Sequence, residues 1–222
     1  MRRLWPFAVV AAVELLGVAA DSTVLQWLAK PLLAPVLLVY LLRVRRRVDP
    51  VAVGLVFATG GDIALLVSGE TAFLVGMGCF LGTQVAFLTA FLRHRRPPFV
   101  AVASYLACWA VANLVLWNSL GPLRLPVLGY GLALSLMAAA AAGVSRRAAL
   151  GGGLFLISDL LIGMEAAGSR IPGHSLAVMT TYIAALLLIT TGWVAAATEG
   201  TRPAAGGDSP APAPGPVPGT AR

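Results

Sequence analysis

Long apolar segments alternate with short polar ones along almost the whole chain. Eight of these segments are 17 to 23 residues long, and an α-helix needs about 20 residues to cross the hydrocarbon core of a bilayer. Connections such as 68–70 are short, so consecutive helices should be antiparallel neighbours. The pattern predicts an all-α membrane protein with eight transmembrane helices, at 4–20, 24–42, 50–67, 71–92, 99–118, 125–143, 149–167 and 175–197.

The composition excludes the main soluble classes of protein. Hydrophobic residues make up 59% of the chain and charged residues 11%, with a mean hydropathy of +0.87, whereas a globular chain carries about 25% charged residues. A soluble enzyme, a disordered chain and a disulfide-bonded scaffold are therefore excluded. The net charge of +7 does not indicate nucleic-acid binding, because the basic residues form short clusters between apolar runs. We expect membrane lipid, and no nucleic acid, as a partner.

The basic clusters predict the orientation of the helices. Of the sixteen Lys and Arg residues, thirteen fall at one end of the predicted bundle, two at the other, and Lys30 inside a segment. The positive-inside rule then places both termini in the cytoplasm. The thirteen are Arg2, Arg3, Arg43, Arg45, Arg46, Arg47, Arg93, Arg95, Arg96, Arg146, Arg147, Arg202 and Arg222, and the two are Arg124 and Arg170.

The two ends of the chain differ from the segments between them. Met1-Arg2-Arg3, an apolar stretch and Val18-Ala19-Ala20 are also typical of a cleavable signal peptide. Glu14 inside that stretch, and the regular alternation of charge in the later loops, favour a retained first helix. Residues 198–222 are rich in Pro, Ala and Gly and cannot bury enough apolar area to offset their ordering entropy. We expect a transmembrane domain at 1–197 and a disordered cytoplasmic tail at 198–222.

Five charged side chains fall inside predicted segments: Glu14, Lys30, Asp62, Asp159 and, close to a segment end, Glu165. A charge at the centre of a membrane helix costs about 2.5–3.5 kcal/mol, so such residues usually mark a functional site. At about 1.5 Å per residue, the first four lie roughly 8–12 Å below the outer ends of their segments. They define a polar layer in the outer half of the bundle.

Uncharged polar residues extend this polar layer. They are Asn113, Tyr130 and Tyr182. The inner half is nearly all Ala, Val, Leu and Gly, with Gln84 and Tyr105 as the main exceptions. Structural roles stay open, because Lys30 and one carboxylate can form a salt bridge that only sets helix register, and tyrosines are common at membrane interfaces. Two aspartates and a lysine at one depth nevertheless favour a site.

Cysteine and histidine residues have simpler interpretations. Cys79 and Cys108 form no CxxC pair and are expected to be buried packing residues. His94 and His174 fall in predicted loops, where we expect them to be solvated. Because no cluster of His and Asp has ligand spacing, we expect no metal site and no cofactor.

A weak internal repeat relates the two aspartates. Asp62 and Asp159 are 97 residues apart, on predicted helices of the same direction. A parallel duplication of four plus four helices would place a site between the halves. The glycines at 60–61 and 151–153 let helices pack closely, and they serve either packing alone or the approach of the two aspartate helices.

Several short motifs follow one another along the chain. They are Lys30-Pro31; Gly61-Asp62-Ile63-Ala64-Leu65-Leu66; Gly76-Met77-Gly78-Cys79-Phe80-Leu81-Gly82; Tyr130 with Met137; Phe155-Leu156-Ile157-Ser158-Asp159; and Met179-Thr180-Thr181-Tyr182-Ile183-Ala184. As an ordered set over about residues 25 to 195, they resemble the YhhN-like lysoplasmalogenase family, an eight-helix membrane family. The chain departs from the family pattern at Gln84, where a His is expected, and at Phe87, where a Tyr is common. A proton relay or head-group contact through that helix therefore does not follow from the resemblance.

The resemblance implies hydrolysis of the vinyl-ether bond of a lysoplasmalogen, a lysoplasmenylethanolamine or lysoplasmenylcholine, to a fatty aldehyde and a glycerophospho-alcohol. Such bonds break when the enol carbon is protonated and water captures the oxocarbenium ion, which calls for one protonated and one ionised carboxyl group, as in glycosidases. Asp62 and Asp159 are the expected catalytic pair. Lys30 either keeps one of them ionised or binds the substrate phosphate. The other residues expected to bind substrate or to pair with charges are Glu14, Asn113, Tyr130, Ser158 and Tyr182.

Two other functions could use the same buried charges. In a small proton-coupled transporter they would form a relay, and in a membrane scaffold they would be purely structural. The scarcity of polar residues in the inner half disfavours a transport path. The Ala-, Gly- and Arg-rich composition is typical of a GC-rich bacterium, so we expect a multi-pass protein of the bacterial inner membrane. Its substrate would be another lysolipid or ether lipid if the source lacks plasmalogens.

Overall fold

The computed structural model describes residues 4–118, 121, 124–166, 168 and 171–199. Within them the chain forms eight α-helices and no β-strand. Each predicted segment coincides with one helix, and the ends differ by three residues at most, which confirms the all-α prediction. The helices are α1 (Trp5–Ala19), α2 (Thr23–Arg45), α3 (Pro50–Ala64), α4 (Glu70–His94), α5 (Phe99–Leu116), α6 (Arg124–Val144), α7 (Arg146–Ala166) and α8 (His174–Glu199).

The described helices suit a membrane. Five of them, α2, α4, α6, α7 and α8, are long and apolar enough to cross a bilayer, whereas α1, α3 and α5 are apolar but shorter. Large apolar side chains face outward, among them Val24, Leu28 and Leu114, which are 68%, 62% and 79% exposed. Such a surface is solvated by lipid and not by water. The chain is a multi-pass integral membrane protein.

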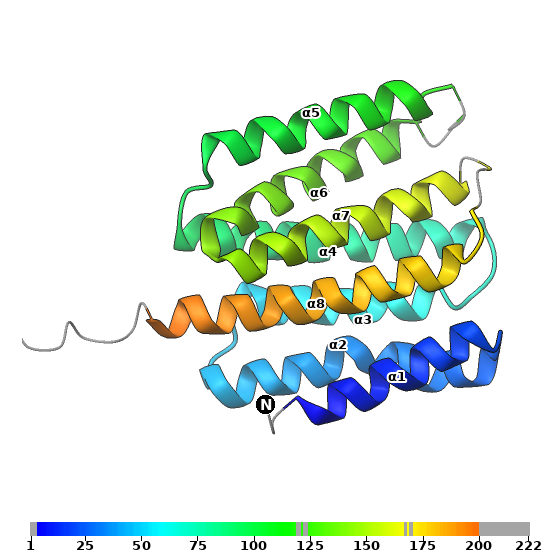
Figure 1. Ribbon diagram of the computed structural model, residues 1–222, viewed down its shortest axis with the longest axis horizontal. Coiled ribbons are helices and arrows are strands. Elements are labelled where there is room, and N and C mark those ends of the chain that lie inside the picture. Colours follow the sequence, from blue (N-terminus) through cyan, green and yellow to red (C-terminus); the bar gives the residue numbers. More distant parts are fainter. Residues whose placement is uncertain (1–3, 119–120, 122–123, 167, 169–170, 200–222) are drawn as a thin grey trace, which may run out of the picture.

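The helices form one bundle in which chain neighbours are antiparallel (Figure 1). α8 runs through the middle of the bundle and packs against α7, α2, α1 and α6. α4 packs against α3 and α6, while α5 lies at one edge and packs against α6. The central place of α8 explains why its side chains Ala185, Leu186 and Ile189 are fully buried.

A buried carboxylate stabilises the start of α3. Asp49 precedes Pro50, the first residue of the helix, and its Oδ1 accepts the backbone N–H of Ala52 at 3.1 Å, as an N-cap residue does. Its Oδ2 accepts the indole N–H of Trp193 in α8 at 2.8 Å and lies 3.8 Å from Arg45 Nε in α2. Asp49, which stands in a predicted loop, thereby joins α2, α3 and α8.

Glycines permit the closest contacts between helices. A β-carbon on Gly151 would lie 2.8 Å from the backbone nitrogen of Ile189, so α7 and α8 pack backbone to backbone. Gly61 faces the ring of Phe80 and brings α3 against α4. The suggestion that the glycines bring the two aspartate helices together is wrong, because α3 packs against α2 and α4, and α7 against α6 and α8. The packing explanation accounts for them.

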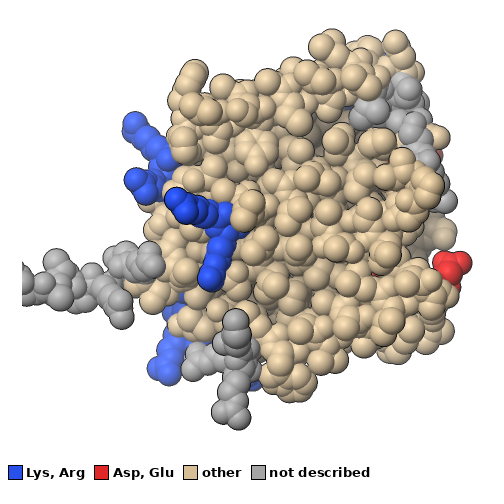
Figure 2. Space-filling model, viewed as in Figure 1, with Lys and Arg blue, Asp and Glu red and all other residues tan. Residues whose placement is uncertain are grey.

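The two ends of the bundle differ in charge (Figure 2). Nine described arginines, at the C-terminal ends of α2 and α4 and the start of α7, lie at one end, which we call the arginine end: Arg43, Arg45, Arg46, Arg47, Arg93, Arg95, Arg96, Arg146 and Arg147. Arg124, the first residue of α6, lies at the opposite end. The other arginines used to predict orientation (Arg2, Arg3, Arg170, Arg202 and Arg222) lie outside the described residues, as does the predicted tail from residue 200 onward.

The two cysteines are not the buried residues that the sequence predicts. Cys79 is partly exposed and Cys108 is exposed. Cys108 belongs to the edge helix α5 and is exposed at a cavity between α5, α6 and α7. Because lipid solvates small apolar side chains as well as a protein core does, an exposed cysteine carries little cost in such a bundle.

Candidate active site

Each of the two aspartates accepts a hydrogen bond from a tyrosine. Asp62, in the last turn of α3, is 1% exposed, and its Oδ2 accepts the hydroxyl of Tyr182 in α8 at 2.8 Å. Asp159 in α7 accepts the hydroxyl of Tyr130 in α6. Buried hydrogen bonds to carboxyl groups are stronger than exposed ones because no water competes. The two tyrosines therefore serve the aspartates, and their interpretation as interfacial aromatics is wrong.

Gln84 is a second donor to Asp159. It lies in the middle of α4, is fully buried, and its Nε2 donates to Asp159 Oδ2 at 3.4 Å. The prediction that Gln84 stands apart in an apolar inner half was wrong, because α4 is 25 residues long and depth counted along one helix does not set height in a bundle of unequal helices. The signal was present as a lone amide in the apolar segment 71–92.

The charged members of the polar layer lie near Asp62. Lys30 of α2 interacts electrostatically with Asp62 and with Glu14 of α1. Glu14 is fully buried. Asp62 Oδ1 is buried and has no hydrogen-bond partner in the described part of the chain. This oxygen is therefore free to accept a further hydrogen bond.

Two aromatic rings hold the ring of Tyr182 in place. The rings of Phe80 and Phe155 meet the Tyr182 ring edge to face, with centroids 5.7 and 5.8 Å away, and lie 6.3 Å from each other. All three side chains are buried, and edge-to-face packing restricts ring orientation. Tyr182 also lies within electrostatic range of Asp159 and Tyr130. The two aspartate–tyrosine pairs are therefore neighbours in one polar region.

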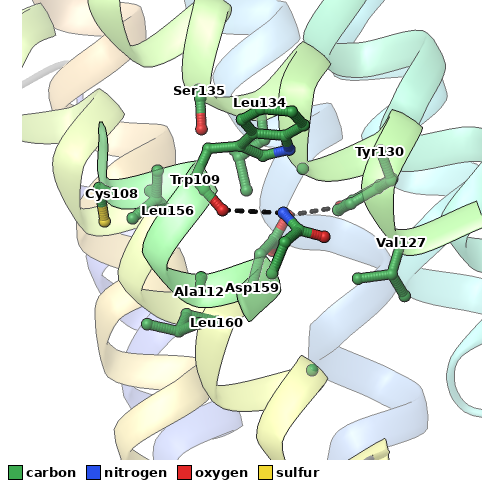
Figure 3. Close-up of a pocket in the computed structure, with 13 residues that line it drawn as sticks. Cys108, Trp109, Ala112, Val127, Tyr130, Leu134, Ser135, Leu156, Asp159 and Leu160 are labelled. Carbon is green, nitrogen blue, oxygen red and sulfur yellow. Dashed lines mark hydrogen bonds between the residues drawn. The ribbon is translucent and has the colours of Figure 1, made fainter. Parts of the chain in front are cut away.

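Asp159 and Tyr130 line an apolar cavity between α5, α6 and α7, which we call the chain cavity (Figure 3). Figure 3 shows the Tyr130 hydroxyl directed at Asp159, with apolar side chains around the pair. These include Trp109, Val127, Leu134, Leu156 and Leu160. Apolar walls of this kind suit a hydrocarbon chain, and the carboxyl group of Asp159 can react with or bind a molecule that carries such a chain.

Two further cavities continue from the chain cavity. The middle cavity shares Val127, Tyr130, Asp159 and Gly163 with it. A third cavity of about 560 Å³, lined by Lys30 among others, opens at the end opposite the arginines. It shares Leu65, Phe73 and Ile162 with the middle cavity. The three cavities therefore lie next to one another, in the order from Lys30 past Asp159 to the edge helix α5.

Two predicted site residues bond to backbone and not to an aspartate. Asn113 lines the chain cavity, and its Nδ2 donates to the backbone oxygen of Trp109 at 2.8 Å. Ser158 is buried and donates to the backbone oxygen of Val178 at 3.1 Å. Asn113 is therefore placed to contact a molecule in the cavity, whereas Ser158 joins α7 to α8.

The prediction that His174 is solvated was wrong. The residue begins α8, is 5% exposed, and its Nε2 lies 3.1 Å from Glu165 Oε2 in α7. The pair holds the end of α7 against the start of α8 beside the third cavity, which Glu165 lines. In the residues that the structure describes, no group of three His, Cys, Asp or Glu side chains could hold a metal ion.

Comparison with known proteins gives one family and a small set of relatives. The model of the YhhN family matches residues 25–193. Lysoplasmalogenase TMEM86B of Homo sapiens is 32% identical over 136 residues, 61% of this chain and 59% of the relative. Lysoplasmalogenase TMEM86B of Sus scrofa is 33% identical over 132 residues, 59% of this chain and 57% of the relative. The chain thus spans less than three fifths of the length of these curated relatives. No solved structure matches it.

Proposed function

The chain belongs to the YhhN family, and we propose that it is a membrane hydrolase that cleaves the vinyl-ether bond of lysoplasmalogens. The products are a fatty aldehyde and a glycerophospho-alcohol such as glycerophosphoethanolamine. The observation that carries the proposal is the position of Asp159, whose carboxyl group faces a cavity with apolar walls. The reaction itself comes from relatives named lysoplasmalogenase.

Asp159 is assigned the role of general acid. Its hydrogen-bond donors, Tyr130 and Gln84, are both uncharged, and both reach Oδ2. A neutral carboxyl group suits this arrangement, because its carbonyl oxygen accepts two hydrogen bonds while the other oxygen carries the proton. That proton is then available to the enol carbon of a chain in the cavity.

Asp62 is assigned the role of general base. The neighbouring Lys30 favours the ionised form of its carboxyl group. Oδ2 is held by Tyr182, while the buried Oδ1 is left to accept a hydrogen bond from water. An ionised carboxylate that holds water can accept a proton from it as the water attacks.

The steps balance without a metal or a cofactor. Asp159 gives its proton to the enol carbon, which leaves an oxocarbenium ion, and water attacks the carbon bonded to the ether oxygen while Asp62 takes its proton. The resulting hemiacetal then collapses. Its hydroxyl proton returns to Asp159, the carbon–oxygen bond to glycerol breaks, and Asp62 protonates the departing oxygen. Aldehyde and alcohol leave, and both carboxyl groups are restored.

In this proposal the bundle is a duplication of four plus four helices, and each half supplies one aspartate, Asp62 as the base and Asp159 as the acid. Four polar residues of the first half have a polar residue 97 to 100 positions later: Glu14 and Asn113, Lys30 and Tyr130, Asp62 and Asp159, Gln84 and Tyr182. Helix contacts repeat as well, since α1–α2, α2–α3, α3–α4 and α4–α6 correspond to α5–α6, α6–α7, α7–α8 and α8–α2. The aspartate of each half is bonded by a donor of the other, Tyr182 to Asp62 and Gln84 to Asp159.

The duplicated frame differs between its halves where the chemistry requires it. In the first half the position beside the aspartate is the cation Lys30, and in the second half it is the uncharged Tyr130. A cation favours an ionised carboxylate, whereas a phenol hydroxyl is compatible with a protonated one. This difference between the partners is the reason for assigning Asp62 as the base and Asp159 as the acid.

The topology that accompanies this function has eight transmembrane helices with both termini in the cytoplasm. The described arginines gather at one end, which supports an orientation with that end inward. The polar site then opens toward the outer leaflet of a bacterial inner membrane, from which a lysolipid can enter. Residues 1–197 form the transmembrane domain, and 198–222 form a tail without a part in catalysis.

The test is release of aldehyde from lysoplasmenylethanolamine by the purified protein in detergent. Asp62→Asn and Asp159→Asn should each lower kcat by about 10²–10⁴-fold, the usual contribution of a general acid or base, without loss of folded protein. Absence of aldehyde from a folded wild-type protein would refute the substrate. If the variants instead abolish uptake or proton leak in vesicles, the protein is a transporter, and if each variant fails to fold, the polar layer is structural.

A further inference from the structure

The third cavity, at the end opposite the arginines, carries charges of both signs. Helices α1, α2, α4, α7 and α8 contribute to its walls, which include Gln26, Lys30, Glu70, Phe73, Glu165 and Ser175. Charged side chains such as Lys30, Glu70 and Glu165 are stable in a membrane protein only when an opposite charge lies near them. A cavity with one ammonium and two carboxylates therefore suits a ligand that itself bears both charges.

The order of these charges along the bundle is the informative feature. Glu70 is the first residue of α4, and Glu165 lies next to the last residue of α7, so both carboxylates are at the mouth. Lys30 is the eighth residue of α2, which places its backbone about 10 Å deeper at 1.5 Å per residue. Lys30 therefore lines the inner part of the cavity and lies within electrostatic range of Asp62. From the mouth inward, the order of groups is the carboxylates of Glu70 and Glu165, the ammonium of Lys30, the apolar residues shared with the middle cavity, and Asp159.

We infer that this cavity binds the phosphoethanolamine head group of the lysolipid, with the ammonium at Glu70 and the phosphate at Lys30. The inference rests on the proposed function and adds the class of head group to it. A lysoplasmenylethanolamine presents ammonium, phosphate, glycerol with its vinyl ether, and hydrocarbon chain in that order. The same order of complementary groups lies along the cavities, from Glu70 and Lys30 to Asp159 and the chain cavity.

The second carboxylate is held in a fixed position. Glu165 Oε2 lies 3.1 Å from Nε2 of the buried His174, which begins α8. This pair fixes the wall that α7 and α8 form. Glu165 thus adds negative potential at the mouth, while Glu70, on the first turn of α4 across the cavity, is the carboxylate that contacts the ammonium.

The walls favour ethanolamine over choline. A primary ammonium donates N–H bonds to carboxylates, and such charge-assisted bonds are strong. The trimethylammonium of choline has no N–H and is bound by cages of several aromatic rings, whereas the described walls of this cavity contain one aromatic ring, Phe73. A preference of about tenfold for ethanolamine is expected, the value of one hydrogen bond to a charged group.

The experiment measures binding without hydrolysis. Ester-linked lysophosphatidylethanolamine, lysophosphatidylcholine and lysophosphatidic acid have no vinyl ether, and their Kd values can be measured on the purified protein in detergent by thermophoresis. Wild-type protein should bind the ethanolamine lipid about tenfold more tightly than the choline lipid. Glu70→Gln should remove this preference and leave the Kd for lysophosphatidic acid unchanged. Lys30→Gln should weaken all three.

Asp21→Asn is the matched control. Asp21 is an exposed carboxylate at the same end, in the connection between α1 and α2, and its substitution removes the same charge, so the preference for ethanolamine should persist. Equal binding of the ethanolamine and choline lipids by the wild-type protein, or an unchanged preference in Glu70→Gln, overturns the head-group site. Because these lipids are not hydrolysed at a vinyl ether, failure of aldehyde release with this preference intact refutes only the proposed reaction.

Discussion

The hydroxyl of Tyr182 in α8 donates to Asp62 in α3 at 2.8 Å, across 120 residues of sequence. The bond joins the last helix of the bundle to the third, and both residues lie within the family match at 25–193. The ring of Tyr182 is packed edge to face by Phe80 and Phe155. The oxygen is therefore held by two separate means, aromatic packing and a hydrogen bond, which substitution can separate.

Tyr182→Phe keeps the ring and removes the hydroxyl. Because Asp62 Oδ2 then loses its donor in a buried position, we expect a loss of stability of about 1–3 kcal/mol and a fall in kcat of at least tenfold. Thermal unfolding measures the loss of stability, and aldehyde release by the same preparation measures the fall in kcat. Tyr40→Phe, in α2 away from the two aspartates, is the control and should leave kcat unchanged. Wild-type kcat in Tyr182→Phe would show that the bond has no part in turnover.

Gln84 is expected to act through Asp159 as a positioning residue. Gln84→Leu removes the second donor to Asp159 at similar volume, so kcat should fall about tenfold, the value of one such bond, while KM changes little. Gln84→His should keep most of the wild-type activity, because an imidazole also offers an N–H donor. A kcat of Gln84→Leu equal to that of the wild type contradicts the assignment.

Gly151→Ala tests the contact between α7 and α8. The new β-carbon would lie 2.8 Å from the backbone nitrogen of Ile189 and 2.9 Å from the backbone oxygen of Ala185, so the helices must separate. We expect a loss of about 1–3 kcal/mol, as for other overpacked cores. The control is Gly78→Ala in α4, where a β-carbon meets no atom within 4 Å. It should be neutral or stabilising by up to about 1 kcal/mol, and equal unfolding temperatures of the two variants would contradict the prediction.

Asp49→Ala tests the joint between α2, α3 and α8. It removes the cap of α3 and leaves the Trp193 indole and the Arg45 guanidinium without this partner. The side chain of Asp49 is 7% exposed, so a loss of about 2–4 kcal/mol is expected. Asp49→Asn keeps an acceptor oxygen and should lose less. We expect a lower unfolding temperature for Asp49→Ala than for Asp49→Asn. The reverse order would contradict the claim that Asp49 joins α2, α3 and α8.

The eight helices, and the position of each polar residue along its own helix, could be predicted from the sequence. A backbone in hydrocarbon must satisfy its own hydrogen bonds, so an apolar segment of bilayer length has one available structure. Depth follows for the same reason, because each residue of a helix adds a known rise. This is why Glu14, Lys30, Asp62 and Asp159 could be assigned to one layer before any contact was known.

The partners within that layer required the tertiary structure. Periodicity does not specify how far each helix is rotated or which helix lies beside it, since nearly every face of these segments is apolar. Only packing shows that Tyr182 meets Asp62, that Gln84 reaches Asp159, that His174 is buried against Glu165, and that the glycines serve neighbouring helices. The sequence alone determined which residues are polar and where along its own helix each one lies. The packing of side chains between helices decided which of them meet, because helix rotation and neighbour choice depend on contacts between segments far apart in the chain.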